Sequence, residues 1–399
     1  LGERNSHKAL IMVSELAKTS IDGFPATLYN TDVDNFVILF RNLEAFNWIN
    51  RWAEKMQSML EQPLAIDRNI MHLEIKIGTF FIEYEKYAKL TVDQAYDNMM
   101  LALNHAKQSS VHQIFNYDVG LSQVASREQM MEIDLATAIQ NNEFYMVLQP
   151  QYHNIEERIV GFEALIRWNN PKYINESPLK FIEMAEKNNM IIDIGRIALH
   201  ETLLIAKQLE PYNLHISLNV SPVQILQVGF VTEFISVFEQ YELKKGSVSL
   251  EVTETFLISS LELVIDKLKL LQKYGFEIHL DDFGTGYSSL QYLRDLPISA
   301  IKIDRAFIKD IERDAHSRAI VTMISNLAKN VGLNVVAEGV ENERQNLIVF
   351  KSGCHVIQGY YISPPVKIED AVKLIEAYNI KKTKVVSVKS QTKQREAKK

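Results

Sequence analysis

Acidic and amide side chains follow successive apolar, strand-like runs in the last two-thirds of the chain. The members of this set are Glu163, Asn219, Glu251, the pair Asp281 and Asp282, and Glu338. Side chains at the carboxyl ends of barrel strands meet at one rim. Carboxylates gathered there repel one another strongly, so protons or metal cations must neutralise them. The oxygen-rich set indicates a hard divalent cation, Mg²⁺ or Mn²⁺, and we expect two per site.

Each of these residues also has an ordinary interpretation. A single carboxylate after a strand is most often a helix cap or a solvated loop residue; Asp281 and Asp282 could cap the next helix, and Asn219 could satisfy a turn. Lys302 stands between two isoleucines, where a buried ammonium group needs an acidic partner. Taken together, the residues favour a metal site over a series of unrelated caps.

The segments that must position these residues alternate between strand and helix. The predicted strands are 144–151, 159–166, 215–219, 248–252, 277–280, 300–303, 334–337 and 355–360. The predicted helices are 178–188, 194–209, 230–241, 261–274, 317–331, 343–350 and 368–378. Eight strands alternating with helices predict an α/β fold, a closed TIM-like (β/α)8 barrel. An open doubly wound sheet is the alternative, but no glycine-rich nucleotide fingerprint follows the first strand.

The first part of the chain has a different pattern. Short strands are predicted at 28–29 and 36–40, a helix over 43–60, a strand over 71–82 and a helix over 92–106. We therefore expect a smaller α/β domain over 1–118 and a helical connector over 119–140. The barrel would occupy 141–380, and a basic, disordered tail would follow over 381–399.

Composition narrows the function classes. The chain has 399 residues and a net charge of −7, which argues against a binder of long nucleic acid because such proteins carry a basic face. The single cysteine, Cys354, cannot form an intrachain disulfide and fits a reducing cytosol. No apolar run approaches the roughly 20 residues of a membrane span. With no signal peptide in view, we expect a cytoplasmic protein or the cytoplasmic part of a membrane-anchored one. The chain begins at Leu1 rather than Met, so we expect a fragment with an upstream sensor.

Seven motifs lie in order over residues 140–380. They are EALIRW at 163–168, NVSP at 219–222, EVTE at 251–254, DDFGTGYSSL at 281–290, IKID at 301–304, AEGVE at 337–341 and QGY at 358–360. This part of the chain resembles the EAL domain, a barrel phosphodiesterase of bacterial signalling. The resemblance implies hydrolysis of the second messenger cyclic di-GMP to linear pGpG.

The resemblance also implies a role for each matching residue. The first metal would be bound by Glu163, Asn219, Glu251 and Asp281. Asp281 would bridge to a second metal, with help from Asp282 and Glu338.

Other matching residues would act around the metals. Lys302 would hold the attacking water or the phosphate, and Arg167 would contact a phosphate oxygen. Gln149 and Gln358 are expected on the substrate side, with Gln358 completing the surroundings of the metal ligands. Glu254 would anchor the loop after Asp282, which links the site to a homodimer contact through the barrel.

The chemistry supports these roles apart from the family. Two metals about 3.5–4 Å apart polarise phosphoryl oxygens and lower the pKa of a bridging water. Lys302 adds positive charge where the transition state gains negative charge. The guanidinium of Arg167 has a fork that matches two phosphate oxygens.

Residues 1–118 resemble the later part of a GGDEF domain, the fold that makes cyclic di-GMP from GTP. The signature is broken, because Asp32 and Val33 replace its two glycines and Asn35 replaces its glutamate. The turn needs glycine's conformational freedom, and the family's first strand and helix are missing ahead of Leu1. We therefore expect a degenerate, truncated domain without cyclase activity.

Two other functions compete with the phosphodiesterase. One is a non-catalytic or autoinhibited receptor for cyclic di-GMP, which intact metal ligands disfavour. The other is a barrel glycosidase with Glu163 and Glu251 as its carboxylate pair. The glycosidase leaves Asn219, Asp281, Asp282 and Lys302 without a role, and its activity would survive a chelator.

Overall fold

The structure is a computed structural model that describes residues 3–32, 34–41, 47–60, 64–66, 69–71, 73–87, 89–108, 113–284, 293 and 296–380. The chain divides into two compact units, residues 1–130 and 131–399, and each is described by itself. The tail predicted over 381–399, Val33, and residues 285–290 of the DDFG motif lie outside the described residues. The domain boundaries at 118, 140 and 380 stay predictions.

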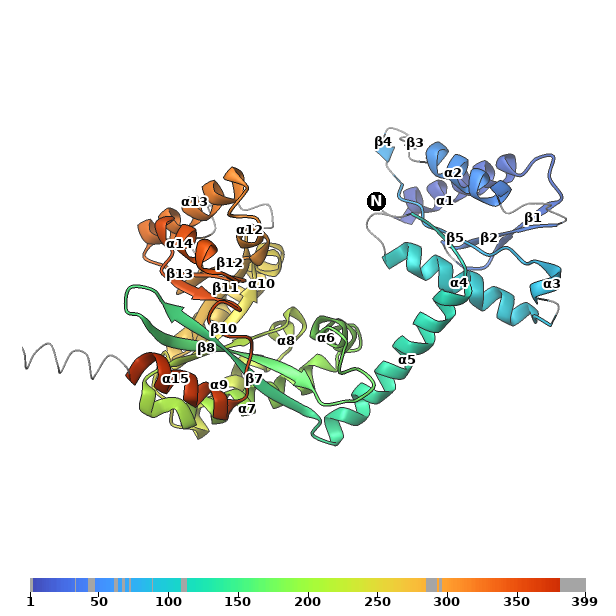
Figure 1. Cartoon of the computed structure of the whole chain (residues 1–399). Coiled ribbons are helices and arrows are strands. Elements are labelled where there is room, and N and C mark those ends of the chain that lie inside the picture. Colours follow the sequence, from blue (N-terminus) through green and yellow to red (C-terminus); the bar gives the residue numbers. More distant parts are fainter. Residues whose placement is uncertain are drawn as a thin grey trace, which may run out of the picture. The chain divides into compact units, whose positions relative to one another are not determined.

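The second unit contains a closed barrel of eight strands (Figure 1). These are β7 (Phe144–His153), β8 (Arg158–Trp168), β9 (His215–Asn219), β10 (Val248–Thr253), β11 (Glu277–Phe283), β12 (Ala300–Ile303), β13 (Asn334–Ala337) and β14 (Val356–Gln358). All eight predicted strands are confirmed, and so is the TIM-like fold. Runs of β-branched and large apolar residues form them because both faces of a barrel strand are covered.

One strand departs from the regular barrel pattern. β7 is antiparallel to both of its neighbours, β8 and β14, and it forms a long hairpin with β8 (Figure 1). Phe144 pairs with Trp168 at one end, and His153 pairs with Arg158 at the other. Only four residues join the two strands, too few for the crossover that a parallel pair requires.

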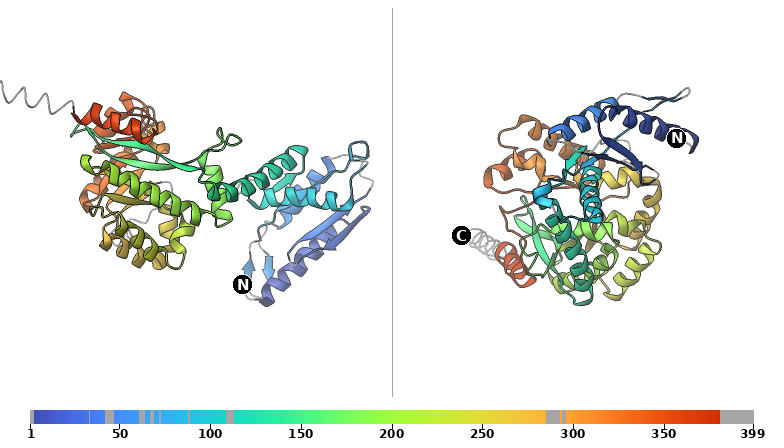
Figure 2. Two further views of the ribbon diagram at one scale, coloured as in Figure 1. Left: turned by 90° about the horizontal axis from the view of Figure 1, so that it is seen from below. Right: turned by 90° about the vertical axis from the view of Figure 1, so that its right-hand side faces the viewer.

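Helices form the outer layer of the barrel, as the two views in Figure 2 show. They are α6 (Pro178–Lys187), α7 (Ile191–Leu209), α8 (Pro222–Leu226), α9 (Phe230–Gln240), α10 (Glu254–Tyr274), α12 (Arg305–Lys309), α13 (Ala315–Val331), α14 (Glu343–Lys351) and α15 (Ile368–Ile375). Leu203, Ile216 and Leu268 are fully buried between the strands and this layer. Burial of such apolar surface is the main stabilising contribution to the unit.

The first unit contains short sheets and helices. Its elements are α1 (Glu3–Ser20), β1 (Ala26–Asn30), β2 (Phe36–Phe40), α2 (Asn47–Leu60), β3 (Leu64–Ile66), β4 (Asn69–Met71), β5 (Ile77–Thr79), α3 (Tyr84–Tyr87), α4 (Val92–Gln108) and β6 (Ile114–Asn116). The sequence analysis did not predict α1. The strand predicted over 71–82 is confirmed only in part: Met71 ends β4, and β5 forms over Ile77–Thr79 and pairs with β6, whereas residues 73–76 and 80–82 are not in a strand.

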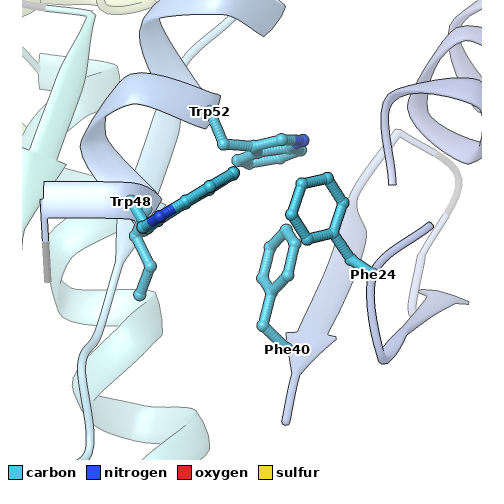
Figure 3. Close-up of a pocket in the computed structure, with 5 residues that line it drawn as sticks. Phe24, Phe40, Trp48 and Trp52 are labelled. Atoms are coloured by element: carbon cyan, nitrogen blue, oxygen red, sulfur yellow. The ribbon is translucent and has the colours of Figure 1, made fainter. Parts of the chain in front are cut away.

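Aromatic side chains hold the β1–β2 hairpin against α2 (Figure 3). Phe24 meets Trp48 edge-on with ring centroids 5.0 Å apart, and Phe40 meets Trp52 in the same way at 5.3 Å. The Trp52 indole N–H donates to Ser20 Oγ over 3.1 Å. Edge-to-face pairs stabilise such contacts beyond the area they bury.

A long helix, α5 (Val119–Gln140), crosses the boundary between the two units at residue 130. Its second half belongs to the barrel unit, where Met131, Leu135 and Ala138 pack in one cluster with Phe144 and Trp168. No helix among the described residues has the length and apolar character needed to cross a membrane.

Candidate active site

The ammonium group of Lys302 lies at the centre of a ring of carboxylates inside the barrel. Its Nζ is 2.5 Å from Glu251 Oε2, 2.5 Å from Glu338 Oε1, 3.2 Å from Asp281 Oδ1 and 3.3 Å from Glu163 Oε2. Only 1% of the Lys302 side chain is exposed, so the contacts exclude water. The acidic partner predicted for this lysine is therefore present, and four carboxylates rather than one supply it.

The strand register places these groups on the same face of the barrel wall, within two residues of one another. Glu251 on β10 pairs with Asn219 on β9, and Thr253 pairs with Asp281 on β11. Glu338 directly follows β13, whose Val336 pairs with Lys302 on β12. Because side chains alternate along a strand, residues at matching levels point into the same layer of the barrel.

Amide groups surround Glu163. Asn219 Nδ2 donates to Glu163 Oε1 over 2.6 Å, and Gln358 Nε2 donates to Glu163 Oε2 over 2.5 Å. Gln358 Nε2 also donates to Gln149 Oε1 over 3.2 Å. The structure thus brings three predicted polar residues into one network with the carboxylates.

The charges in this ring are strongly coupled. Burial opposes ionisation of Glu163, but the Lys302 ammonium and the Gln358 and Asn219 amides outweigh it and lower the pKa of Glu163. Burial also opposes the charge on Lys302, but Asp281, Glu163, Glu251 and Glu338 raise the pKa of Lys302 well above its usual range. This lysine is therefore a cation at neutral pH.

One ammonium group cannot neutralise four carboxylates. Burial, the neighbouring Glu163 and further acids raise the pKa of Glu251 well above its ordinary value. Burial and the nearby carboxylates likewise raise the pKa of Glu338 to about 8, against the opposing effect of Lys302. Without a further cation, part of this site holds protons at neutral pH, as the sequence argument requires.

The donor set fits a hard divalent cation. Among the described residues, the buried Glu251 Oε1 has no hydrogen-bond partner, and the buried Asp281 Oδ1 has the 3.2 Å ion pair with Lys302 but no hydrogen bond. Carboxylate oxygens with surplus negative charge are the ligands that Mg²⁺ and Mn²⁺ prefer. Within the described part of the chain, no three His, Cys, Asp or Glu side chains already form a cage for a metal. The Lys302 ammonium instead occupies the centre of the carboxylates.

Asp282 lies in a second acidic pair that the sequence analysis missed. Its backbone has a φ of 55°, and its side chain forms a hydrogen bond with Asp304. Burial, Asp281 and Asp304 raise the pKa of Asp282 to about 6. Asp304 also caps α12 by accepting from Ala306 N over 2.8 Å. The position of Asp304 directly after β12 is the signal in the sequence that indicates this pair.

Glu254 holds the start of the segment that follows β11. The side chain is fully buried, and its Oε2 accepts from Gly284 N over 2.9 Å. Gly284 has a φ of +100°, a conformation that other residues adopt only with strain. Glu254 is thus an anchor for backbone next to the site.

Arg167 lies apart from the carboxylate ring. Its Nη1 donates to the Ile166 carbonyl over 2.8 Å, and burial lowers the pKa of the Arg167 guanidinium against small opposing effects of Tyr145 and Glu163. Its expected contact with a phosphate stays a prediction.

Comparison with known proteins places this barrel in a family. The model described as EAL domain matches residues 132–365. The chain belongs to the EAL domain family. The seven motifs and the carboxylate ring lie within or at the edges of the matched residues.

Relatives with similar EAL domain sequences are bacterial signalling proteins. The bifunctional diguanylate cyclase/cyclic di-GMP phosphodiesterase MucR of Pseudomonas aeruginosa is 29% identical over 366 residues, 90% of this chain and 52% of MucR. The probable cyclic di-GMP phosphodiesterase PdeG of Escherichia coli is 35% identical over 253 residues, 60% of this chain and 48% of PdeG. This chain therefore spans about half the length of these relatives.

Solved structures of EAL domains are also similar. The structure titled PaMucR phosphodiesterase, c-di-GMP complex, has a TM-score of 0.58 and 33% identity, and the match covers 61% of this chain and 99% of that one. At this identity the likeness extends beyond the fold to the family.

Proposed function

We propose that this chain is a metal-dependent phosphodiesterase that hydrolyses cyclic di-GMP to linear pGpG. The observation that carries the proposal is the ring of Glu163, Glu251, Asp281 and Glu338 around Lys302. This ring has more acid than its one lysine can balance. Relatives named as cyclic di-GMP phosphodiesterases, such as NbdA of Pseudomonas aeruginosa, support the choice of substrate.

The carboxylates would hold two divalent cations, Mg²⁺ or Mn²⁺. The ligands would be Glu163, Asn219, Glu251, Asp281, Asp282 and Glu338, with Asp304 beside Asp282. The bound metals polarise phosphoryl oxygens and lower the pKa of water.

The remaining residues bind and orient. Lys302 keeps its positive charge among the acids and stabilises negative charge that develops on the phosphate. Arg167 offers two donors to phosphate oxygens. Gln358 and Gln149 orient Glu163 and border the substrate, and Glu254 holds the backbone after Asp282 in place.

The glycosidase alternative fits the geometry poorly. Glu163 and Glu251 contact the same ammonium group, and Glu251 is only 1% exposed. A general acid must reach the leaving group of a bulky sugar. The pair is enclosed where a glycosidase needs an open cleft.

The autoinhibited-receptor alternative would require the first unit to hold the barrel inactive, so the state of that unit matters. At the turn where the GGDEF likeness places a catalytic acid, Lys107 Nζ donates to Asn35 Oδ1 over 3.2 Å. An amide held by a lysine is a poor metal site, so we propose that this unit is a degenerate GGDEF domain without cyclase activity. Regulation by this unit, a homodimer through the barrel, an upstream sensor and a cytoplasmic location belong to the same proposal.

The test is direct turnover. The purified chain is incubated with cyclic di-GMP and Mg²⁺, Mn²⁺ or EDTA, and pGpG is followed by chromatography. We expect product with metal and none with EDTA. Glu163→Ala should lower turnover by orders of magnitude, whereas Glu262→Ala, at an exposed acid on α10, should not. Nucleotide binding without turnover in any metal would establish the receptor instead.

A further inference from the structure

A chain of hydrogen bonds continues from Glu163 into the barrel, away from the carboxylate ring. Gln358 Nε2 donates to Glu163 Oε2 over 2.5 Å, and Gln151 Nε2 donates to Gln358 Oε1 over 3.0 Å. Gln151 Oε1 then lies 2.7 Å from His215 Nε2. Three consecutive contacts thus join a metal-binding carboxylate to a histidine at the first residue of β9.

These hydrogen-bonded side chains occupy space that a barrel normally fills with branched apolar side chains. Gln151 is fully buried, and Gln358 is 3% exposed. Gly161 leaves the room for the imidazole, because a Cβ there would lie 2.4 Å from His215 Cε1. Buried amides without partners are costly, so each link depends on the next.

The direction of the chain follows from Glu163. An ionised carboxylate only accepts hydrogen bonds, so Gln358 must turn its NH₂ group toward Glu163 and its oxygen toward Gln151. Gln151 must then donate to Gln358 and turn its own oxygen toward His215. That oxygen needs a donor, which is His215 Nε2–H.

We propose that Gln151 and His215 are positioning residues that hold the amide of Gln358 in the orientation that donates to Glu163. The proposal rests on the phosphodiesterase function proposed above. In the described part of the structure, neither residue forms a hydrogen bond or ion pair with the four carboxylates; both act through Gln358. Outer partners of metal ligands commonly change metal affinity or activity by about 10- to 100-fold when removed.

The tautomer of His215 directly tests whether the hydrogen-bond chain has the proposed direction. Burial and the neighbouring His279 lower the pKa of His215 to about 4, so the ring carries one proton at neutral pH. The backbone of Val160 opposes this lowering of the His215 pKa, so its carbonyl is the alternative acceptor for that proton. The hydrogen-bond chain requires the His215 proton on Nε2, facing Gln151. Without Gln151 the proton would move to Nδ1.

The experiment compares variants of the full chain by three measurements: kcat and KM with cyclic di-GMP, Mn²⁺ affinity by calorimetry, and the His215 tautomer by ¹⁵N NMR. Gln151→Leu should lower kcat or Mn²⁺ affinity about 10-fold, leave KM within about twofold, and move the His215 proton from Nε2 to Nδ1. Gln151→Glu keeps the size of the side chain but replaces the donor to the Gln358 oxygen with a carboxylate that only accepts, so the loss of kcat or Mn²⁺ affinity should be at least as large.

Histidine variants separate positioning from packing. His215→Leu should lose several-fold in kcat or Mn²⁺ affinity, and His215→Gln, which restores an N–H donor, should recover most of the loss. His279→Leu is the matched control, because His279 is buried with its ring centroid 6.0 Å from that of His215 and bonds to neither glutamine in the described structure. Equal losses in both leucine variants without rescue by His215→Gln would overturn the proposal.

Failure of the two proposals can be told apart. A chain that binds Mn²⁺ but does not hydrolyse cyclic di-GMP would contradict the proposed function, while the tautomer and Mn²⁺ affinity would still test the positioning chain. An Nδ1–H tautomer in the unmodified protein, or Gln151 variants with unchanged Mn²⁺ affinity and kcat, would contradict the positioning role in an active enzyme.

Discussion

At the residue scale, Lys302 determines the charge balance of the site. Its ammonium group contacts four carboxylates and takes a central position among the oxygens that a metal would share. A cation bound there and the lysine therefore stabilise the same negative charges. Removal of either one leaves the acids to repel each other or to bind protons.

Lys302→Met tests this balance. Loss of the buried cation should lower the free energy of unfolding of the metal-free protein by about 3 kcal/mol, and Mn²⁺ should restore part of it by supplying positive charge. Urea denaturation with and without Mn²⁺ measures both effects. Lys309→Met, at an exposed lysine on α12, is the control; equal stability of the two variants without metal would contradict the charge argument.

Metal binding should release protons. The raised pKa values of Glu251 and Glu338 mean that the metal-free site holds protons that ligation must displace. Mn²⁺ affinity should therefore increase as the pH rises from 6 to 8.5, and the calorimetric heat should differ between buffers of different ionisation enthalpy. Heats that do not depend on the buffer at pH 7 would show that the acids are already ionised.

At the element scale, the start of the segment after β11 depends on a side chain from α10. The Gly284 N–H donates to Glu254 Oε2, so Glu254→Ala should free this backbone and lower kcat about tenfold, with Mn²⁺ affinity nearly unchanged. Glu254→Gln keeps an accepting oxygen and should retain most of the activity. Steady-state kinetics on the two variants distinguish the outcomes, and a change in KM alone would contradict the anchoring role.

Strands and helices were predictable from local pattern, but their limits and directions were not. The strands of the barrel follow apolar runs, whereas α13 begins two residues before its predicted start because Asp314 accepts from His316 N and Ser317 N. α10 begins seven residues early, at Glu254, and has a kink at Ser260. The reversed direction of β7 has no signature in apolar periodicity, since alternation reads the same in both directions.

The charged residues of the site were predictable from the sequence, because charged side chains are unusual at the ends or inside of apolar strands. Acids at strand ends and a lysine between isoleucines indicate chemistry by themselves, and the structure brings them together. Gln151 and His215 carry no such signal, because a glutamine or histidine in a strand is common. Their contacts depend on the closure of β14 against β7, which joins residues about two hundred positions apart.

At the scale of the whole molecule, the barrel includes part of the preceding helix. Met131, Leu135 and Ala138 of α5 are buried with Phe144 and Trp168. A truncation that begins at residue 141 removes these side chains and should be markedly less stable than one that begins at 119. Thermal denaturation of the two fragments measures the difference; equal melting temperatures would show that α5 is not part of the barrel's core.

The reversed direction of β7 determines at which end of the barrel the chain enters. In a barrel of uniformly parallel strands, the chain arrives at the end opposite the catalytic rim. Here β7 begins beside Trp168 and Arg167, since Phe144 and Tyr145 pair with them, so α5 delivers the chain to the rim itself. A displacement of that helix would therefore act first on the strand end that carries Arg167, the residue proposed to bind phosphate, and this strand end is only four residues along β8 from Glu163.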